Sequence, residues 1–297
     1  MIKKILVTLA KLLLCGGAFY SGIILGGGLW GAAGLPMPDM PAGSNPAAIQ
    51  TAMMFSSLLA AACLAFLSAR LAVNFILRWL SLAALVGLAY GVNNYLEARI
   101  FTTYSAASPV TVLMAVMSGL AGGAAAAWLF PSRAKPEPLR VASAPFFRKF
   151  GGAGWAWRVL AAVAAFPVIY YLFGMLISPI VLPYYQQAGS GLTIPGLGTL
   201  LPVLFLRSFF FLAASFMIVA AWGKTRLSLA LGLGLTMFML VGGIGLLVAS
   251  FLPGVLRVVH SFEILADSLC YVTALVLLFR PGAPAAHTRT EPIAAGE

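Results

Sequence analysis

The chain has 297 residues, of which 62% are hydrophobic and 8% are charged, and its mean hydropathy is +1.01. Soluble domains carry about 25% charged residues, so this composition excludes a soluble globular domain and predicts the lipid bilayer as the main partner. The formal net charge is +11. Because the basic residues stand in short connections beside apolar segments, the positive-inside bias explains them, and nucleic acid is not expected as a partner.

Apolar segments long enough to cross a bilayer recur along the chain. A spanning α-helix needs about 20 residues, and eight such helices are predicted, within 1–34 and near 50–69, 74–96, 108–130, 157–182, 198–222, 228–252 and 258–280. The first apolar run is too long for a signal peptide, so it is interpreted as a helix. The predicted fold class is therefore an all-α integral membrane protein. No polar stretch is long enough for a separate domain of about 50 residues.

The first predicted helix contains closely spaced glycines. Gly26, Gly28 and Gly31 match the spacing of a dinucleotide-binding fingerprint, but no strand precedes them. The spacings of Gly22 with Gly26 and of Gly27 with Gly31 are instead typical of small residues at helix–helix contacts in membranes.

The distribution of basic residues predicts the orientation in the membrane. Eight spans place both termini on one side. Fifteen basic residues fall on that side, namely Lys3, Lys4, Lys11, Arg70, Arg78, Arg133, Lys135, Arg140, Arg148, Lys149, Arg158, Lys224, Arg226, Arg280 and Arg289. Only Arg99 and Arg257 fall on the other side. The positive-inside bias therefore predicts a multi-pass protein of the inner (plasma) membrane with both termini cytoplasmic.

Short landmarks recur in the same order in the two parts of the chain. Leu35-Pro36 and Trp128-Leu129-Phe130-Pro131 correspond to Leu182-Pro183 and Leu278-Phe279-Arg280-Pro281. The pattern predicts two tandem four-helix repeats in the same orientation, 1–131 and 157–281, with a basic cytoplasmic linker at 132–156 and a cytoplasmic tail at 282–297. The alternative is that apolar sequences resemble each other through composition alone.

Polar residues within the spans gather at similar depth near the outer surface. The third span ends in a polar group, the eighth begins with residues at helical spacing on one face, and the sixth carries an arginine about ten residues below its outer end. The candidate binding residues are Asn93, Asn94, Glu97, Arg207, His260, Glu263 and Asp267. Together they predict an outward-facing polar cavity.

The charge of Arg207 needs a partner, because a lone charge inside a membrane costs at least ~2.5 kcal/mol. Asp267 is the first predicted partner and Glu263 the second. The alternative interpretation is that Arg207 and Asp267 only hold two helices together, while Glu97 and His260 lie among lipid headgroups.

These residues allow three functions. The leading hypothesis is a site that binds or translocates a small solute or ion, with the acids and the histidine as a proton or cation relay. The second is a non-catalytic membrane subunit or scaffold with a membrane-protein partner or in a homo-oligomer. The third is a membrane-embedded enzyme acting on a lipid at the outer leaflet. No catalytic motif is present and no cofactor is assigned; His260, Glu263 and Glu97 give a weak zinc pattern, so a metal also stays unassigned.

Aromatic residues are interpreted as structural. Tyr184 and Tyr185 lie near a span end, where an interfacial belt is expected. The aromatic residues of the sixth span are expected to contact lipid or pack against other helices; they are Phe205, Phe209, Phe210 and Phe211.

Overall fold

The computed structural model describes residues 2–39, 44–103, 108–132, 146–187 and 189–280. Its N-terminal half contains α1 (Ile2–Ala32), α2 (Pro46–Ser68), α3 (Phe75–Leu85), the π-helix η1 (Val86–Val92), α4 (Asn93–Phe101) and α5 (Val110–Leu129). Its C-terminal half contains α7 (Gly152–Tyr185), α8 (Leu197–Ala221), α9 (Arg226–Phe238), the π-helix η2 (Met239–Gly243), α10 (Ile244–Val248) and α11 (Gly254–Phe279). Because α3, η1 and α4 form one rod and α9, η2 and α10 another, eight rods are long and apolar enough to span a membrane. The predicted all-α fold class is confirmed.

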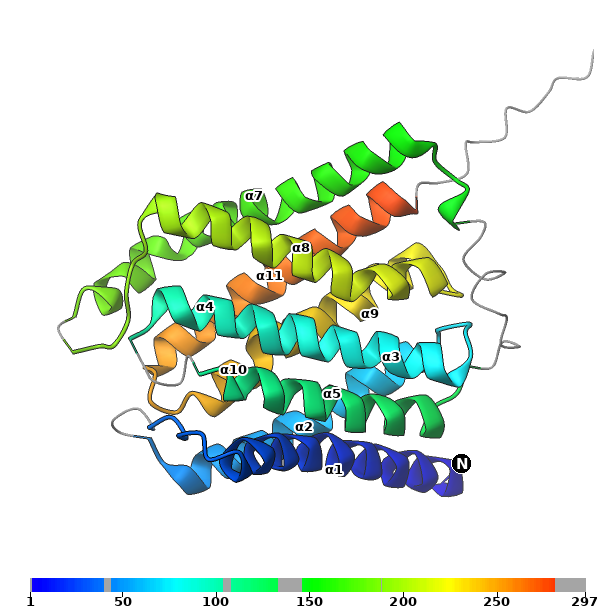
Figure 1. The fold of residues 1–297 in the computed structure, drawn as a ribbon, viewed down its shortest axis with the longest axis horizontal. Coiled ribbons are helices and arrows are strands. Elements are labelled where there is room, and N and C mark those ends of the chain that lie inside the picture. Colours follow the sequence, from blue (N-terminus) through cyan, green and yellow to red (C-terminus); the bar gives the residue numbers. More distant parts are fainter. Residues whose placement is uncertain (1, 40–43, 104–107, 133–145, 188, 281–297) are drawn as a thin grey trace, which may run out of the picture.

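The rods form one bundle in which α1 and α7 lie at opposite edges (Figure 1). Within the N-terminal half α1 packs on α5 and α2, and within the C-terminal half α7 packs on α11 and α8. The beginning of α1 and the end of α11 lie at the same end of the bundle, here called the terminal end; the opposite end is the distal end. Over the described residues, the chain therefore runs from one end of the bundle to the other eight times and returns to its starting side.

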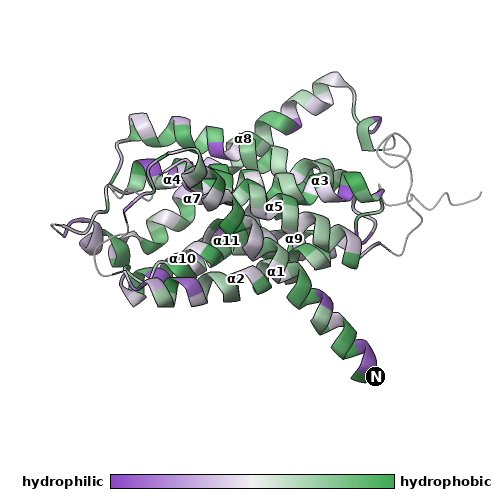
Figure 2. Ribbon diagram, turned by 60° about the horizontal axis from the view of Figure 1, so that its bottom comes forward, coloured by the Kyte–Doolittle hydropathy of each residue, from purple (hydrophilic) through white to green (hydrophobic). Residues whose placement is uncertain are grey.

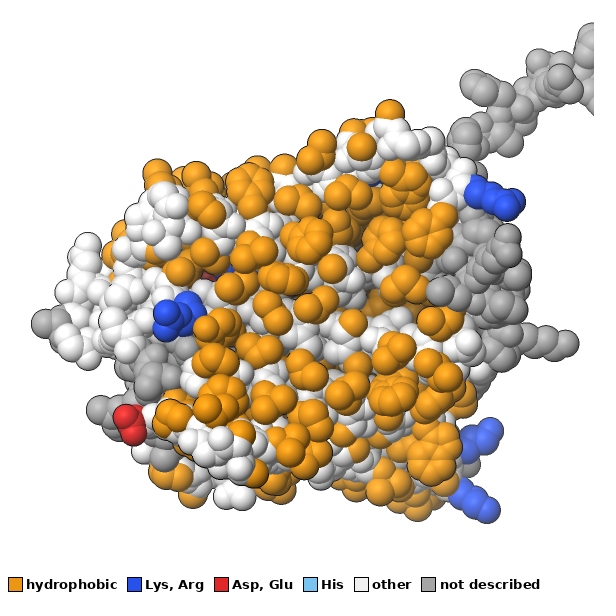
Figure 3. Space-filling model, viewed as in Figure 1, with side chains coloured by type: hydrophobic (Ala, Val, Ile, Leu, Met, Phe, Trp, Pro, Cys, Tyr) orange, Lys and Arg blue, Asp and Glu red, His pale blue; other side chains and the backbone are white. Residues whose placement is uncertain are grey.

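The surface of the bundle matches a lipid environment. Hydrophilic residues gather toward the two ends of the helices (Figure 2), and hydrophobic side chains cover most of the lateral face that Figure 3 shows. Four members of the predicted basic set, Arg133, Lys135, Arg140 and Arg289, lie outside the described residues, as do the linker residues 133–145 and the tail 282–297. The helix α7 begins at Gly152, inside the segment predicted as linker.

At the terminal end, polar side chains form hydrogen bonds with the free backbone amide and carbonyl groups of helix ends. Asn74 caps α3 by accepting a hydrogen bond from the Leu77 amide (2.9 Å), and Thr225 caps α9 by accepting one from the Ser228 amide (3.3 Å). At the ends of the last helix of each half, Lys11 Nζ donates to the Leu129 carbonyl (3.1 Å) and Arg158 Nε to the Leu278 carbonyl (2.9 Å). Cations stabilise helix C-termini, where carbonyl groups are unpaired.

At the terminal end, two turns connect the halves, in addition to the helix contacts between them and a second bridge between Thr102 and Leu192. The turn after α2 and the turn after α8 form an isolated antiparallel bridge between Leu71 and Trp222. The Ala72 amide donates to the Ala221 carbonyl (3.3 Å), and the Gly223 amide donates to the Arg70 carbonyl (3.1 Å). Each turn thus gives and receives one hydrogen bond, and each lies just before a capped helix.

Each half also has a π-helical segment in its third rod, and η1 contacts η2 near the middle of the bundle. A π-turn holds one residue more than an α-turn and leaves backbone groups available for other partners. In η1 the Leu88 carbonyl accepts from both the backbone amide and Nδ2 of Asn93. These segments shift the phase of α4 and α10 relative to the helices that precede them.

Glycines bring α1 close to α5. A Cβ atom added at Gly22 would meet the backbone of Met117 and Ser118, and one added at Gly26 would meet the backbone of Met114. The prediction that Gly22 and Gly26 form a helix contact is confirmed. Gly31 has open space where a Cβ would be.

Candidate functional site

A cavity of about 290 Å³ lies between the two halves in the distal part of the bundle. Its walls come from α4 of the N-terminal half and from α7, α8, α11 and the α9–η2–α10 rod of the C-terminal half. Thr102 and Leu192, beside the distal ends of α4 and α8, line one part of it, and Tyr271 on α11 lines a deeper part. The cavity therefore extends from the distal loops into the membrane-spanning region.

Arg207 on α8 is the least exposed charged side chain among the described residues that line the cavity, at 1% exposed. Its Nη2 donates to Glu97 Oε2 at 2.9 Å, which joins α8 to α4. The prediction that Arg207 pairs with Asp267 or Glu263 is wrong. Glu97 follows η1, whose wider turn shifts the phase of α4, and a regular helix through residues 74–96 does not anticipate that shift.

Three aromatic rings surround the guanidinium of Arg207. The Arg207 Cζ lies 5.4 Å from the ring centre of Phe166 and 5.8 Å from those of Tyr170 and Phe211. Cations are attracted to the faces of aromatic rings within about 6 Å. The rings therefore help to hold the buried cation in place. Among the described residues, its ion-pair partner is Glu97.

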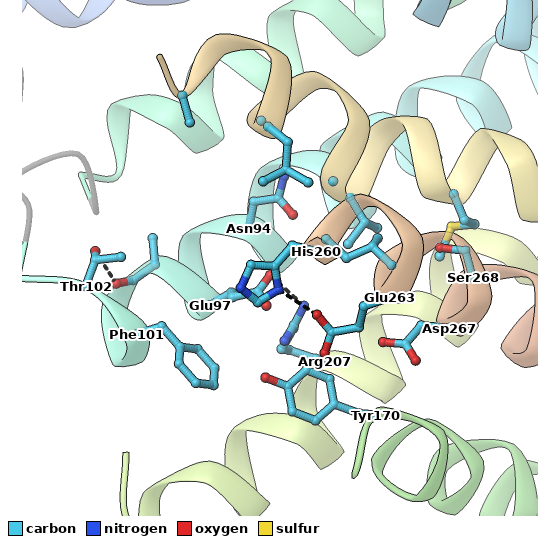
Figure 4. A pocket seen from close by; sticks show the side chains of 18 of the residues that line it. Asn94, Glu97, Phe101, Thr102, Tyr170, Arg207, His260, Glu263, Asp267 and Ser268 are labelled. Atoms are coloured by element: carbon cyan, nitrogen blue, oxygen red, sulfur yellow. Dashed lines mark hydrogen bonds and ion pairs between the residues drawn. The ribbon is translucent and has the colours of Figure 1, made fainter. Parts of the chain in front are cut away.

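The helix α11 contributes the acidic side of the cavity. His260 Nδ1 lies 2.6 Å from Glu263 Oε2, and the His260 ring contacts the ring of Tyr185. Glu263 and Asp267 are buried, at 7% and 5% exposed. Figure 4 shows Glu97, Arg207, His260, Glu263 and Asp267 gathered around the same space, with Tyr170 beside them.

The two predicted asparagines differ in their surroundings. Asn94 lines the cavity, and its Nδ2 donates to the Leu240 carbonyl of η2 at 3.3 Å, so it links the two halves. Asn93 is fully buried, bonds to Leu88 within its own rod and is not among the residues that line the cavity. The other five predicted site residues, Glu97, Arg207, His260, Glu263 and Asp267, all line it.

The aromatic side chains that line the cavity are not among the residues predicted from the sequence; they include Phe166, Tyr170, Tyr185 and Phe211. Tyr185 was expected in an interfacial belt, yet it lines the cavity against His260. Phe205 and Phe209 are exposed on the hydrophobic surface, as lipid contacts require, whereas Phe211 is 2% exposed and faces the cavity. Phe166 and Tyr170 stand four residues apart on one helical face, and that spacing was the available signal.

Several buried polar atoms in and beside the cavity have no hydrogen-bond partner within the described part of the chain. They are Nε and Nη1 of Arg207, Oδ1 of Asp267 and Oδ1 of Asn94. Three carboxyl groups share the cavity with one guanidinium and one imidazole. The site can therefore accept hydrogen bonds and positive charge on its α11 side and donate hydrogen bonds on its α8 side.

Within the described residues, no three His, Cys, Asp or Glu side chains are placed to hold a metal ion. Comparisons with protein-family models, curated proteins and solved structures found no match. What the arrangement can do follows from its chemistry: it can bind charged groups of both signs, and its carboxyl and imidazole groups can take up and release protons.

Proposed function

We propose that this membrane protein binds a small solute or ion in the cavity and moves it across the bilayer. The observation that carries the proposal is that five ionisable side chains from α4, α8 and α11 line one cavity that extends to the distal loops; they are Glu97, Arg207, His260, Glu263 and Asp267. Ionisable residues within membrane spans are costly, and their usual role is on a substrate or ion pathway.

We further propose that the distal end faces outward and that the termini are cytoplasmic in an inner (plasma) membrane. The support is the concentration of basic residues at the terminal end. Partial burial lowers the pKa of Lys149, and the positive charges of Arg226, Arg280 and Arg158 lower it further. In this orientation the cavity takes its solute from outside the cell.

The two halves are proposed to be tandem repeats in the same orientation, 1–131 and 157–281. Support comes from the reciprocal hydrogen bonds between the turns at Leu71 and Trp222 and from the π-segment in each third rod. The bond from Lys11 to the end of α5 also has a counterpart in the bond from Arg158 to the end of α11. Repeats related by an axis along the membrane normal are a known construction of transporters.

The proposal is tested by a thermal-shift screen of the purified protein, followed by flux measurements in proteoliposomes. The screen contains Na⁺, K⁺, amines, carboxylates and amino acids. Any solute that raises the melting temperature is then loaded for flux. Glu263→Gln and Asp267→Asn keep the side-chain shape and remove a charge, so both variants should fold and lose flux.

Arg99→Gln is the matched control, because Arg99 is exposed at the same end and does not line the cavity. Its flux should equal that of the wild type. Unchanged flux in both Glu263→Gln and Asp267→Asn would refute the proposal. A screen without a stabilising solute, together with a stoichiometric protein partner after mild-detergent purification, would replace it with a subunit or scaffold role.

A further inference from the structure

The guanidinium of Arg207 uses only part of its hydrogen-bonding capacity within the described protein. Nη2 is bonded to Glu97, while Nε and Nη1 have no partner, and the side chain is 1% exposed. A guanidinium presents its N–H groups in a planar fork that matches an anionic group such as a carboxylate. The Arg207 side of the cavity therefore suits the anionic end of a ligand.

The wall formed by α11 suits a cationic group instead. Asp267 is 5% exposed and its Oδ1 has no partner within the described chain. The neighbouring acid, Glu263, has Oε2 bonded to His260, while its Oε1 faces α7 at Gly174, where an added Cβ would lie 3.6 Å from it. Two buried carboxyl groups one helical turn apart can accept the N–H groups of a cationic group placed between them.

A ligand of one charge sign satisfies only one of these walls. A simple anion would bond to Arg207 but would lie in a cavity with three carboxyl groups. A simple cation would be attracted to Glu263 and Asp267 but would leave Nε and Nη1 of Arg207 without an acceptor. A ligand with both charges satisfies both walls.

We infer that the cavity takes a small organic zwitterion, with its anionic group on Arg207 and its ammonium group at Glu263 and Asp267. This inference rests on the proposed solute-binding function of the same site. The volume of about 290 Å³ lies near the lower end of the range of about 300–1,000 Å³ that small-ligand pockets occupy, so the cavity suits a small organic molecule. The rings of Phe166, Tyr170 and Phe211 would surround its apolar part.

The test compares matched ligands that differ in one charged group. Thermal shift and calorimetry are run with β-alanine and the standard α-amino acids, and each zwitterion that binds is compared with its decarboxylated amine and its deaminated acid. We expect both single-charge analogues to bind at least about tenfold more weakly, because each leaves the buried polar atoms of one wall, Nε and Nη1 of Arg207 or Oδ1 of Asp267, without a partner.

Variants locate the two ends of the ligand. Asp267→Asn should weaken the zwitterion at least about tenfold, while the deaminated acid should change little. Arg207→Lys keeps the positive charge but removes the fork, so it should weaken the zwitterion and the acid together. Arg99→Gln should bind like the wild type. If Arg207→Lys does not fold, the Asp267→Asn comparison decides alone.

Each other outcome has a distinct meaning. An amine or an acid that binds as tightly as its zwitterion would overturn the inference while leaving the proposed solute-binding function in place. Binding of Na⁺ or K⁺ without any zwitterion would do the same. If no solute in either screen binds, the proposed function itself fails.

Discussion

In each half the first helix packs on the last, α1 on α5 and α7 on α11, but the two contacts are made by different residues. In the N-terminal half, Gly22 and Gly26 bring α1 against the backbone of α5. In the C-terminal half, the equivalent contact of α7 with α11 is made by aromatic rings, with the centres of Phe166 and Tyr271 5.6 Å apart. The contact between α1 and α5 is called the N-terminal seam, and the contact between α7 and α11 the C-terminal seam. Backbone atoms come close together in the N-terminal seam, whereas aromatic side chains lie between the helices in the C-terminal seam.

This difference accounts for the position of the cavity. In the C-terminal half, α11 carries the buried side chains of Glu263 and Asp267, and Gly174 on α7 faces Oε1 of Glu263. The N-terminal half contributes Asn94 and Glu97 from α4. The N-terminal half is thus closely packed between α1 and α5, and the C-terminal half contributes most of the residues that line the cavity. The ion pair of Glu97 and Arg207 joins the two halves at this cavity.

The ion pair between the halves should give the largest effect on stability. Replacement of Glu97 by leucine leaves the buried Arg207 without its counter-charge. Breaking a buried pair costs about 3–5 kcal/mol, and because the Glu97 side chain is 30% exposed, the loss should lie at the lower end of that range. Thermal unfolding in detergent micelles should show a clear loss for Glu97→Leu. Glu97→Leu combined with Arg207→Leu should be more stable than Glu97→Leu alone, because no unpaired charge remains. A double variant no more stable than the single one would contradict the role of this pair.

The glycine seam of the N-terminal half should give the next largest effect. Gly22→Val inserts a branched side chain against the backbone of Met117 and Ser118. Overpacking of this kind costs about 1–3 kcal/mol. Gly28→Val is the control, since Gly28 is on the same helix, is exposed and has open space around its Cβ position. Equal melting temperatures for the two variants would show that the N-terminal seam is not closely packed.

The eight spans could be predicted because bilayer thickness imposes a length of apolar sequence that hydropathy detects. The depth of Arg207, Glu263 and Asp267 could be predicted in the same way, since residue position along a spanning helix gives depth directly. Six of the seven candidate residues line one cavity, and Asn93 does not.

Rotation about the helix axes could not be predicted from the sequence. The π-segments η1 and η2 have no distinctive composition, yet they change which side chains face the cavity and direct Asn93 toward Leu88. The partner of Arg207 depends on this phase, which is why Asp267 was predicted instead of Glu97. Tyr185 was missed for another reason, because interfacial and cavity-lining tyrosines occupy the same positions near span ends.

The helix caps should give the smallest effects and compare the halves at matching positions. Asn74 and Thr225 each begin the third rod of their half, and each follows one of the two paired turns by three residues. Because each cap satisfies one amide of a helix start, Asn74→Ala and Thr225→Ala should each cost about 1 kcal/mol. Thr8→Ala is the control, since the exposed Thr8 hydroxyl bonds within its own helix. Similar losses of stability at both caps, measured by thermal unfolding, would support the same role for the two turns in the two halves. A loss at one cap alone would mean that the two turns do not play equivalent roles. The proposed tandem repeat would then lose its strongest local support.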